Sequence, residues 1–166
     1  MAERLTAVFK PPAGFARIGI FSTGAQLCAL RWLPAAEKTP ALGRTAPDPL
    51  VDEICRQLTA YFADPHWCFS LPLQLVGSTF QRRVWQALRN IPVGTTCSYG
   101  ALAARLQTSP RAIGGACRCN PVPIVIPCHR VVSASGPGGY CGRTRGVLWD
   151  IKRRLLAHEA PGQEQQ

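Results

Sequence analysis

Cys128 and His129 are the neighbouring residues in this sequence with the clearest capacity for chemistry, and they stand between Pro127 and Arg130. The thiolate is the reactive form of a cysteine. A nearby imidazole and guanidinium favour it, whereas an apolar environment of Ile and Val opposes it. Adjacent side chains in regular structure point in different directions, so His129 needs a turn or a bridging water to act on Cys128. Two interpretations stay open at this point: a reactive cysteine, or a structural Cys-His pair.

The segment that leads to this cysteine contains three prolines, at positions 121, 123 and 127. Proline excludes a helix and favours an extended residue before it, so we expect residues 120–127 to present Cys128 from an extended segment. The other seven of the eight cysteines are expected to be small buried apolar residues.

The start of the chain lacks the apolar run of a secretory signal. A reduced, intracellular protein, cytoplasmic or nuclear, is therefore expected rather than a disulfide scaffold. No apolar run reaches the roughly 18 residues of a membrane span, so no membrane partner is predicted.

Positive charge is concentrated in one half of the chain. Residues 1–77 carry seven Lys or Arg and six Asp or Glu, whereas residues 78–166 carry twelve Lys or Arg and three Asp or Glu. Eleven of those twelve are arginines, whose planar guanidinium groups suit phosphate contacts. The second half is therefore expected to bind a polyanion such as nucleic acid, and a generally basic surface is the alternative.

The first half of the chain has the pattern of a small α+β unit. Short strands are predicted at 6–9, 16–21 and 26–32, separated by turns that contain Pro and Gly. A proline-rich loop at 34–47 leads to a helix with Asp48 as its N-cap and Pro49 in its first position. Asp-Pro at 64–65 ends this helix.

Helical signals dominate the second half. Ser-Thr-Phe-Gln at 78–81 has the spacing of a capping box and predicts the start of a helix, which ends in a turn at 90–94. A helix at 99–106 is separated by a short turn from a basic helix at 111–118. Two helices joined in this way are typical of a helix-turn-helix DNA-binding motif.

Two glycines, at 114 and 115, stand inside the second of those helices. An interior glycine costs about 1 kcal/mol of helix stability relative to alanine, so the pair calls for a reason. The glycines permit either close packing against another helix or close approach of a bulky external partner. In the second case Arg111 and Arg118, at the ends of the helix, would meet phosphates.

Ordered motifs on both sides of Cys128 resemble those of the O6-alkylguanine-DNA alkyltransferases, also called methylated-DNA–protein-cysteine methyltransferases. Asn-Pro-Val-Pro-Ile at 120–124 and Pro-Cys-His-Arg-Val at 127–131 carry the resemblance most strongly. Further matching motifs lie at 80–88, 91–94, 98–103, 111–116 and 155–159. The resemblance covers residues 78–159, and residues 1–75 agree with the family only in size and layout.

This resemblance implies an α+β protein of two domains. Residues 1–76 are expected to form a small domain with an antiparallel, ribonuclease-H-like sheet. Residues 77–166 are expected to form a mostly helical domain with a winged-helix-like helix-turn-helix, which binds DNA and accepts the alkyl group. The expected protein acts as a monomer, without a cofactor or a metal.

The resemblance also implies a reaction, the direct reversal of DNA damage. Cys128 takes the alkyl group, usually methyl, from O6-alkylguanine or O4-alkylthymine, once and irreversibly. His129 takes the thiol proton through a water, and Glu159 orients and charges the imidazole. Tyr99 donates a proton or a hydrogen bond to the leaving guanine, and Asn120 organises the turn before the active-site segment.

The resemblance further implies that double-stranded DNA binds through its minor groove. The damaged base is expected to be turned out, because a thiol cannot reach the alkyl carbon inside the stack. Arg111 would fill the space of the displaced nucleotide. The other residues assigned to DNA contact are Ala112, Gly114, Gly115, Arg118 and Arg130. Those assigned to the substrate pocket are Tyr99, Pro123, Val131, Tyr140 and Cys141.

The chain departs from the family pattern after the reactive segment. The stretch at 135–140 is shorter than usual, and Cys141 stands where a Ser or Gly is common. Between Gly142 and Ile151 the chain is longer than usual and adds Arg143, Arg145 and Trp149. The added residues either extend the DNA contact or reshape the pocket rim, and the preferred alkyl size stays open.

Two other classes of protein compete with this interpretation. A non-catalytic helix-turn-helix protein that binds the lesion is one, but such relatives replace the reactive cysteine that is present here at 128. A cysteine hydrolase is the other, and it leaves the basic half unexplained. Cys28, His66 and Cys68 lack the spacing of a closed zinc site, so they are not expected to hold a metal.

Overall fold

The computed structural model describes residues 4–35 and 47–160. Two compact units divide the chain between Val76 and Gly77, and each is described by itself. Most of the proline-rich loop expected at 34–47 lies outside the described residues. Among the described helices, none combines the length and the apolar character needed to cross a membrane.

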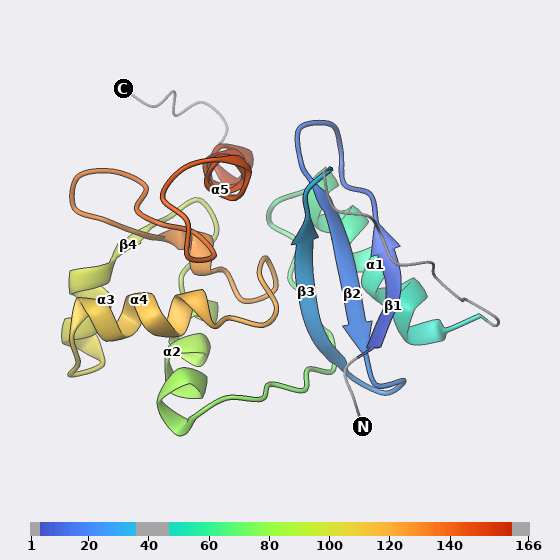
Figure 1. Ribbon diagram of the computed structural model, residues 1–166, viewed down its shortest axis with the longest axis horizontal. Helices are drawn as coiled ribbons and strands as arrows, with labels where there is room; N and C mark the ends of the chain where they lie inside the picture. Colours follow the sequence, from blue (N-terminus) through green and yellow to red (C-terminus); the bar gives the residue numbers. More distant parts are fainter. Residues whose placement is uncertain (1–3, 36–46, 161–166) are drawn as a thin grey trace. The chain divides into compact units, whose positions relative to one another are not determined.

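The N-terminal unit contains a three-stranded antiparallel sheet in the order β1-β2-β3 (Figure 1). The strands are β1 (Arg4–Phe9), β2 (Arg17–Ser22) and β3 (Leu27–Leu33). They confirm the three strands expected from the sequence to within two residues at each end. Ile18 and Ile20 alternate along β2 and are both buried, so they place one apolar face of the sheet toward the core.

Helix α1 (Pro49–Ala63) packs against β1 and begins where the sequence predicted. The Asp48 carboxylate accepts hydrogen bonds from the N–H groups of Leu50 and Val51 at 3.0 and 3.3 Å, which satisfies two of the free donors at the helix start. Asp64 is the C-cap, as expected from the Asp-Pro pair. The buried apolar face of the helix consists of Val51, Ile54, Leu58 and Tyr61.

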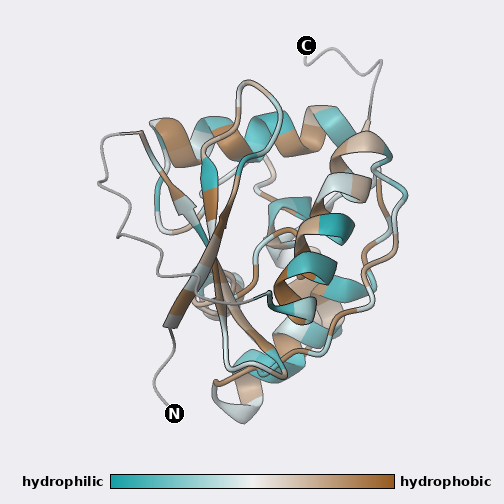
Figure 2. Cartoon of the chain, turned by 90° about the vertical axis from the view of Figure 1, so that its right-hand side faces the viewer, coloured by the Kyte–Doolittle hydropathy of each residue, from teal (hydrophilic) through white to brown (hydrophobic). Residues whose placement is uncertain are grey.

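The C-terminal unit is mostly helical. Its elements are α2 (Thr79–Arg89), α3 (Tyr99–Arg105), α4 (Pro110–Arg118), the 3₁₀ helix η1 (Cys128–Arg130) and α5 (Val147–Glu159). Two short parallel strands, β4 (Cys97–Ser98) and β5 (Val131–Val132), pair the start of α3 with the end of η1. Figure 2 shows hydrophobic and hydrophilic bands on the helices, as their inward and outward faces require. The chain therefore has the expected α+β fold.

Local capping signals set the helix starts in this unit. Ser78 and Gln81 form both hydrogen bonds of the capping box, at 3.1 and 2.8 Å. The Ser109 hydroxyl accepts the N–H of Ala112 at 3.2 Å and begins α4. Helix α4 packs against both α2 and α3, so the face it turns away from them is left for the functional site.

The segment before Cys128 is not extended throughout, which corrects the expectation from its prolines. The N–H of Ile126 donates to the carbonyl of Val122 at 2.9 Å, and Ile124 has a φ of 75°. The Asn120 side chain clamps this turn, because its amide donates to the Ile126 carbonyl at 2.8 Å and its oxygen accepts the Val122 N–H at 3.1 Å. Proline excludes a helix here, but the three residues between Pro123 and the next proline remain free to turn.

The cysteines also differ from the expectation. Only two of the eight are buried, Cys117 and Cys128, whereas Cys68, Cys119 and Cys141 are exposed and the rest are half-buried. Hydropathy predicts burial for a cysteine on average, but each position is decided by the face of the element that carries it.

Candidate active site

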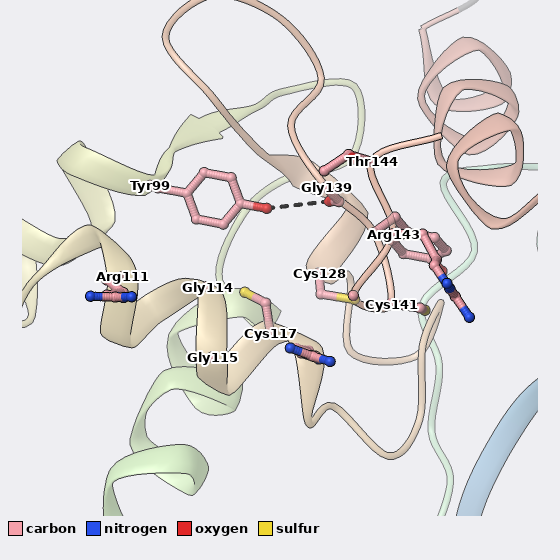
Figure 3. A pocket seen from close by; sticks show the side chains of 13 residues that line it. Tyr99, Arg111, Gly114, Gly115, Cys117, Cys128, Gly139, Cys141, Arg143 and Thr144 are labelled. Carbon is pink, nitrogen blue, oxygen red and sulfur yellow. Dashed lines mark hydrogen bonds between the residues drawn. The ribbon is translucent and has the colours of Figure 1, made fainter. Parts of the chain in front are cut away.

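Cys128 is presented at the first residue of η1. Its N–H donates to the carbonyl of Ile126 at 2.8 Å, which fixes the backbone directly beneath the thiol. The residue is 4% exposed, and it lines a cavity of about 460 Å³ that Figure 3 shows from close by. The lining of this cavity comprises Tyr99, Arg111, Gly114, Gly115, Cys117, Arg118, Cys128 and residues 139–144.

Three of the five residues expected in the substrate pocket line this cavity, namely Tyr99, Tyr140 and Cys141. Pro123 and Val131 do not, because both are buried in the interior of the unit. The turn at 122–126 carries Pro123 inward, and Val131 lies in β5 with no exposed surface. The structure therefore does not bring these two residues together with the other three.

His129 and Glu159 form a buried pair next to this cysteine. Nε2 of His129 lies 2.8 Å from Oε1 of Glu159, and the two side chains are 0% and 2% exposed. The other ring nitrogen, Nδ1, is buried and has no hydrogen-bond partner among the described residues. A buried polar atom without a partner is costly, so its presence beside a cysteine marks a functional position.

The charges around this pair fix its protonation. Burial by itself would raise the pKa of Glu159, but the hydrogen bond from His129 and the hydrogen bonds and charge of Arg130 outweigh it and hold the pKa well below the ordinary value. Burial lowers the pKa of His129 against the pull of the carboxylate. At neutral pH the site therefore holds a carboxylate and a neutral imidazole.

Arg130 belongs to this buried network and does not face an external partner. Its Nε and Nη2 atoms donate to the two oxygens of Glu159, each at 2.9 Å, and Nη1 donates to the carbonyl of Ile91 at 2.6 Å. The side chain is 12% exposed. The structure therefore does not bring Arg130 together with the cavity-lining residues assigned to DNA contact: adjacency to Cys128 in the sequence placed it at the site, but its guanidinium forms hydrogen bonds inside the protein.

The environment of Cys128 combines opposing effects. Burial raises the pKa of the thiol, while a hydrogen bond from Asn120, the charge of Lys152 and nearby backbone N–H groups lower it. The resting cysteine is thus a thiol, and groups that stabilise a thiolate are already in place around it. Asn120 has two tasks here, because the same side chain also clamps the turn before Cys128.

Lys152 is the residue of this site that sequence reasoning missed. It lies on α5 with no exposed surface, and its Nζ donates to the carbonyls of Val131 and Gly139 at 2.7 and 2.8 Å. Burial lowers the pKa of Lys152 to about 8, against the opposing effect of Cys128 and the other cavity thiols. One signal was available in the sequence: Lys152 is three residues before Leu155 and seven before Glu159, which places a lone lysine on the inward face of the last helix.

Tyr99 opens α3 and points into the cavity. Its hydroxyl donates to the carbonyl of Gly139 at 3.3 Å, and Nζ of Lys152 lies 5.7 Å from the ring centroid. Burial raises the pKa of Tyr99, so the phenol remains a proton donor across the neutral range. A donor is therefore held above the floor of the cavity, on the side opposite α4 (Figure 3).

The paired glycines of α4 have open space in front of them. A Cβ built on Gly114 or Gly115 meets no atom within 4 Å. Close packing against another helix within the described chain is therefore excluded as the reason for them. Both glycines line the cavity, between Arg111 and Arg118. This leaves close approach of an external partner as the interpretation that fits.

The possible zinc ligands in the N-terminal unit do not gather. No group of three or more His, Cys, Asp or Glu side chains suited to a metal occurs in the part of the chain that the structure describes. Cys28 donates to the side chain of Gln74 at 3.3 Å, and His66 contacts Asp64 at 3.3 Å.

The buried thiol, the His-Glu pair and the arginines around one cavity are typical of a protein that uses a cysteine nucleophile on an anionic substrate. Comparison with known proteins gives the family. Residues 79–161 match the family model described as "6-O-methylguanine DNA methyltransferase, DNA binding domain". The chain belongs to the 6-O-methylguanine DNA methyltransferase family.

Relatives agree with this result in sequence. A methylated-DNA–protein-cysteine methyltransferase of Mycolicibacterium paratuberculosis is 50% identical over 106 residues, which cover 62% of this chain and 61% of that protein. The protein of the same name from Mycobacterium tuberculosis strain H37Rv is 42% identical over 143 residues, 81% of this chain and 85% of that one.

Solved structures agree in fold. The M. tuberculosis O6-methylguanine methyltransferase matches with a TM-score of 0.75 and 35% identity, covering 92% of this chain and 90% of its own. The M. tuberculosis protein OGT in complex with DNA matches with a TM-score of 0.72 and 38% identity over 89% of each chain.

Proposed function

We propose that this protein repairs DNA by direct reversal, moving an alkyl group from O6 of guanine, or O4 of thymine, to Sγ of Cys128. The relatives named methylated-DNA–protein-cysteine methyltransferase support this activity. The observation that carries it is the position of Cys128, on the floor of an arginine-lined cavity and next to a buried His-Glu pair.

The reaction is a single displacement at carbon. The Cys128 proton passes through a water to Nδ1 of His129, and the thiolate attacks the alkyl carbon. The S–C bond forms as the C–O6 bond breaks, and the electron pair of that bond stays on the guanine. Glu159 stabilises the imidazolium that results, because its carboxylate already contacts Nε2.

Tyr99 assists the leaving group in this scheme. Guanine departs as an anion, and a hydrogen bond or a proton from the phenol lowers the energy of that charge. Lys152 adds a positive charge beside the same atoms. The product of the transfer is a thioether, from which none of the cavity groups can remove the alkyl group, so each chain acts once.

DNA binding is assigned to the open face of α4. Arg111, Ala112, Gly114, Gly115 and Arg118 would contact a duplex there, through its minor groove. The damaged base has to leave the stack to reach Cys128, and Arg111 would fill the space behind it. A cavity of about 460 Å³ is within the range of sites that hold small ligands, which suits a single base.

We further propose the division of labour between the two units. Residues 77–166 would bind DNA through a winged-helix-like helix-turn-helix formed by α3 and α4, and would also accept the alkyl group. Residues 1–76 would form a ribonuclease-H-like supporting domain, and the protein would act as a monomer. Analytical ultracentrifugation with and without duplex tests the last point.

One experiment tests the function. The protein is incubated with a duplex that contains O6-methylguanine, and the products are mapped by mass spectrometry. We expect one methyl group per chain, on Cys128. Cys128→Ala should bind the duplex without transfer, and Cys119→Ala, an exposed cysteine outside the cavity lining, should transfer normally.

Two results would overturn the proposal: continued turnover beyond one methyl per chain, or methylation of another cysteine. Tight binding of the duplex by the wild-type protein without any transfer would favour the non-catalytic lesion-binding alternative instead.

A further inference from the structure

Arginines stand on more than one side of the cavity mouth. Arg111 and Arg118 come from α4, whereas Arg143 comes from the loop before α5. Figure 3 shows Arg111 and Arg143 on different sides, with Cys128 between them. All three residues are exposed. Arg143 belongs to the stretch that is longer here than the family pattern, so its presence needs a reason of its own.

The loop that carries Arg143 is built rigidly. Tyr140 and Arg143 exchange two backbone hydrogen bonds, of 2.7 and 2.8 Å, around the turn at Cys141 and Gly142. Cys141 and Gly142 have φ values of 48° and 76°. A positive φ at both central positions is what a type I′ hairpin turn requires. Non-glycine residues adopt such a φ at a cost, so the conformation of Cys141 is imposed by its surroundings.

Side chains of α5 hold the base of the same loop. Trp149 Nε1 donates to the carbonyl of Gly138 at 3.0 Å, and Lys152 Nζ donates to that of Gly139 at 2.8 Å. Helix α5 therefore holds the backbone directly before the turn, and the two hydrogen bonds between Tyr140 and Arg143 connect Arg143 to that anchored segment. This position is set by the fold, and the arginine is not on a freely moving loop tip.

Arg118 reaches from α4 to this loop. A Cβ placed on Gly142 would lie 2.8 Å from Nε of Arg118, so the guanidinium end of that side chain lies directly against the glycine backbone. With its positive φ and this close contact, position 142 has two separate reasons to be glycine. Arg118, from α4, thus contacts the turn whose next residue is Arg143, and both residues line the cavity.

In the described part of the C-terminal unit, no acidic side chain pairs with Arg118 or Arg143. Residues 77–160 contain two carboxylates, Asp150 and Glu159, and Glu159 is already held by His129 and Arg130. Among the described residues, none forms a hydrogen bond or an ion pair with the side chain of Arg118 or Arg143. Two guanidinium groups that line one cavity without a paired carboxylate favour the binding of an external anion there.

We infer that Arg118 and Arg143 form a phosphate-binding site at the cavity mouth, which binds the backbone phosphate of the nucleotide that enters the cavity. This inference rests on the proposed function. A nucleotide carries its phosphates at the mouth while its base lies inside, and the guanidinium fork matches phosphate geometry. Arg143 therefore extends the DNA contact, and the contacts of Arg118 and Arg143 with the phosphate hold the extruded nucleotide in place during transfer.

The test compares Arg118→Ala and Arg143→Ala with Arg89→Ala, which removes an exposed arginine at the end of α2, outside the cavity lining. Duplex affinity is measured by fluorescence anisotropy over a salt series, in the Cys128→Ala background so that no transfer occurs. We expect each cavity variant to weaken binding about three- to tenfold and to reduce the slope of log Kd against log salt by about one. Arg143→Lys should recover the slope but only part of the affinity.

Transfer is measured separately, with Cys128 present, from duplex and from O6-benzylguanine as a free base that has no phosphate. The loss of rate in Arg118→Ala and Arg143→Ala should be larger on the duplex than on the free base. Equal losses on the two substrates, or an Arg89→Ala variant that weakens binding as much as Arg143→Ala, would overturn the inference. Failure of the wild-type protein to alkylate Cys128 would instead overturn the proposed function, and the salt series would still decide the role of the arginines.

Discussion

His129 and Glu159 contact each other through Nε2 and Oε1 at 2.8 Å, although thirty residues separate them in the chain. The same carboxylate receives two hydrogen bonds from Arg130. Glu159 thus joins the last turn of α5 to the residues that follow the reactive cysteine. We therefore expect this one buried carboxylate to affect both the stability of the unit and the proposed transfer reaction, and the two effects can be measured separately.

Glu159→Gln should reduce the rate of alkyl transfer by about 10²-fold, the contribution of a working general base, because the imidazolium loses its counter-charge. It should also lower the free energy of unfolding by about 3 kcal/mol, since Arg130 is left partly buried without an anion. Single-turnover kinetics and urea unfolding measure the two effects. Glu53→Gln, which removes a half-buried carboxylate paired with Arg56 on α1, is the control for the transfer rate and should leave that rate unchanged.

The pH dependence of that stability difference follows from the lowered pKa of Glu159. The ionised carboxylate stabilises the folded state fully above the unfolded pKa, about 4.3, and this contribution is lost as pH falls toward the lower folded pKa. The gap in unfolding free energy between wild type and Glu159→Gln should therefore shrink below about pH 4. A gap that stays constant down to pH 2 would show that the carboxylate charge is not the source.

Lys152→Met should slow transfer at neutral pH and change the shape of its pH profile. The pKa of Lys152 is about 8, so the cation beside Cys128 is present below that pH and is lost above it. In wild type the rise in rate that comes from thiol ionisation should therefore level off or reverse near pH 8. The pH profile of Lys152→Met should lack this change near pH 8. In Lys152→Arg the same change should occur at higher pH. Parallel profiles for wild type and Lys152→Met would contradict this role.

Tyr99→Phe should slow transfer from duplex by about 100-fold, within the range that a proton donor contributes. The ring and its packing remain, and one hydrogen bond of 3.3 Å to Gly139 is lost, so the melting temperature should change little. The rate difference between wild type and Tyr99→Phe should be smaller for an O6-alkylated purine whose ring is more acidic. Such a purine is a better leaving group and depends less on a hydrogen bond or a proton from the phenol. An equal deficit with both purines would indicate that Tyr99 positions the base without donating to it.

Features determined by neighbouring residues could be predicted from the sequence. Asp48, Ser78 and Ser109 cap their helices as expected, because a cap is a hydrogen bond to a backbone N–H only two or three residues away. The three strands and the start of α1 follow for the same reason. The identity of the reactive cysteine depended on a resemblance and not on any local rule.

Features determined by tertiary packing could not be predicted. Arg130 contacts Ile91 and Glu159, which are 39 and 29 residues away, so its inward direction is set by how η1 packs against α2 and α5. Lys152 can be buried because the carbonyls of Val131, in β5, and of Gly139 accept hydrogen bonds from its ammonium group. The turn at Ile124 depends on the side chain of Asn120, which no propensity for the residues inside the turn describes.

Gly114→Ala and Gly115→Ala should stabilise the protein and weaken its binding to DNA. Both glycines lie inside α4, and a new Cβ at either position meets no atom within 4 Å, so each substitution should gain about 0.5–1 kcal/mol of helix stability. If a duplex lies against this face, the added methyl group holds the backbone away from it. Affinity should then fall about tenfold, equivalent to about 1.4 kcal/mol.

Thermal unfolding and anisotropy with a duplex measure the two effects on the same samples. Gly100→Ala, in the first turn of α3, is the control for the gain in helix stability. A loss of stability in the α4 variants would mean that the glycines serve packing after all. No atom of the described chain lies close enough to require glycine at these two positions, so an external partner is the remaining explanation. Unchanged affinity would show that this partner is not DNA, and α4 would no longer be assigned to the DNA interface.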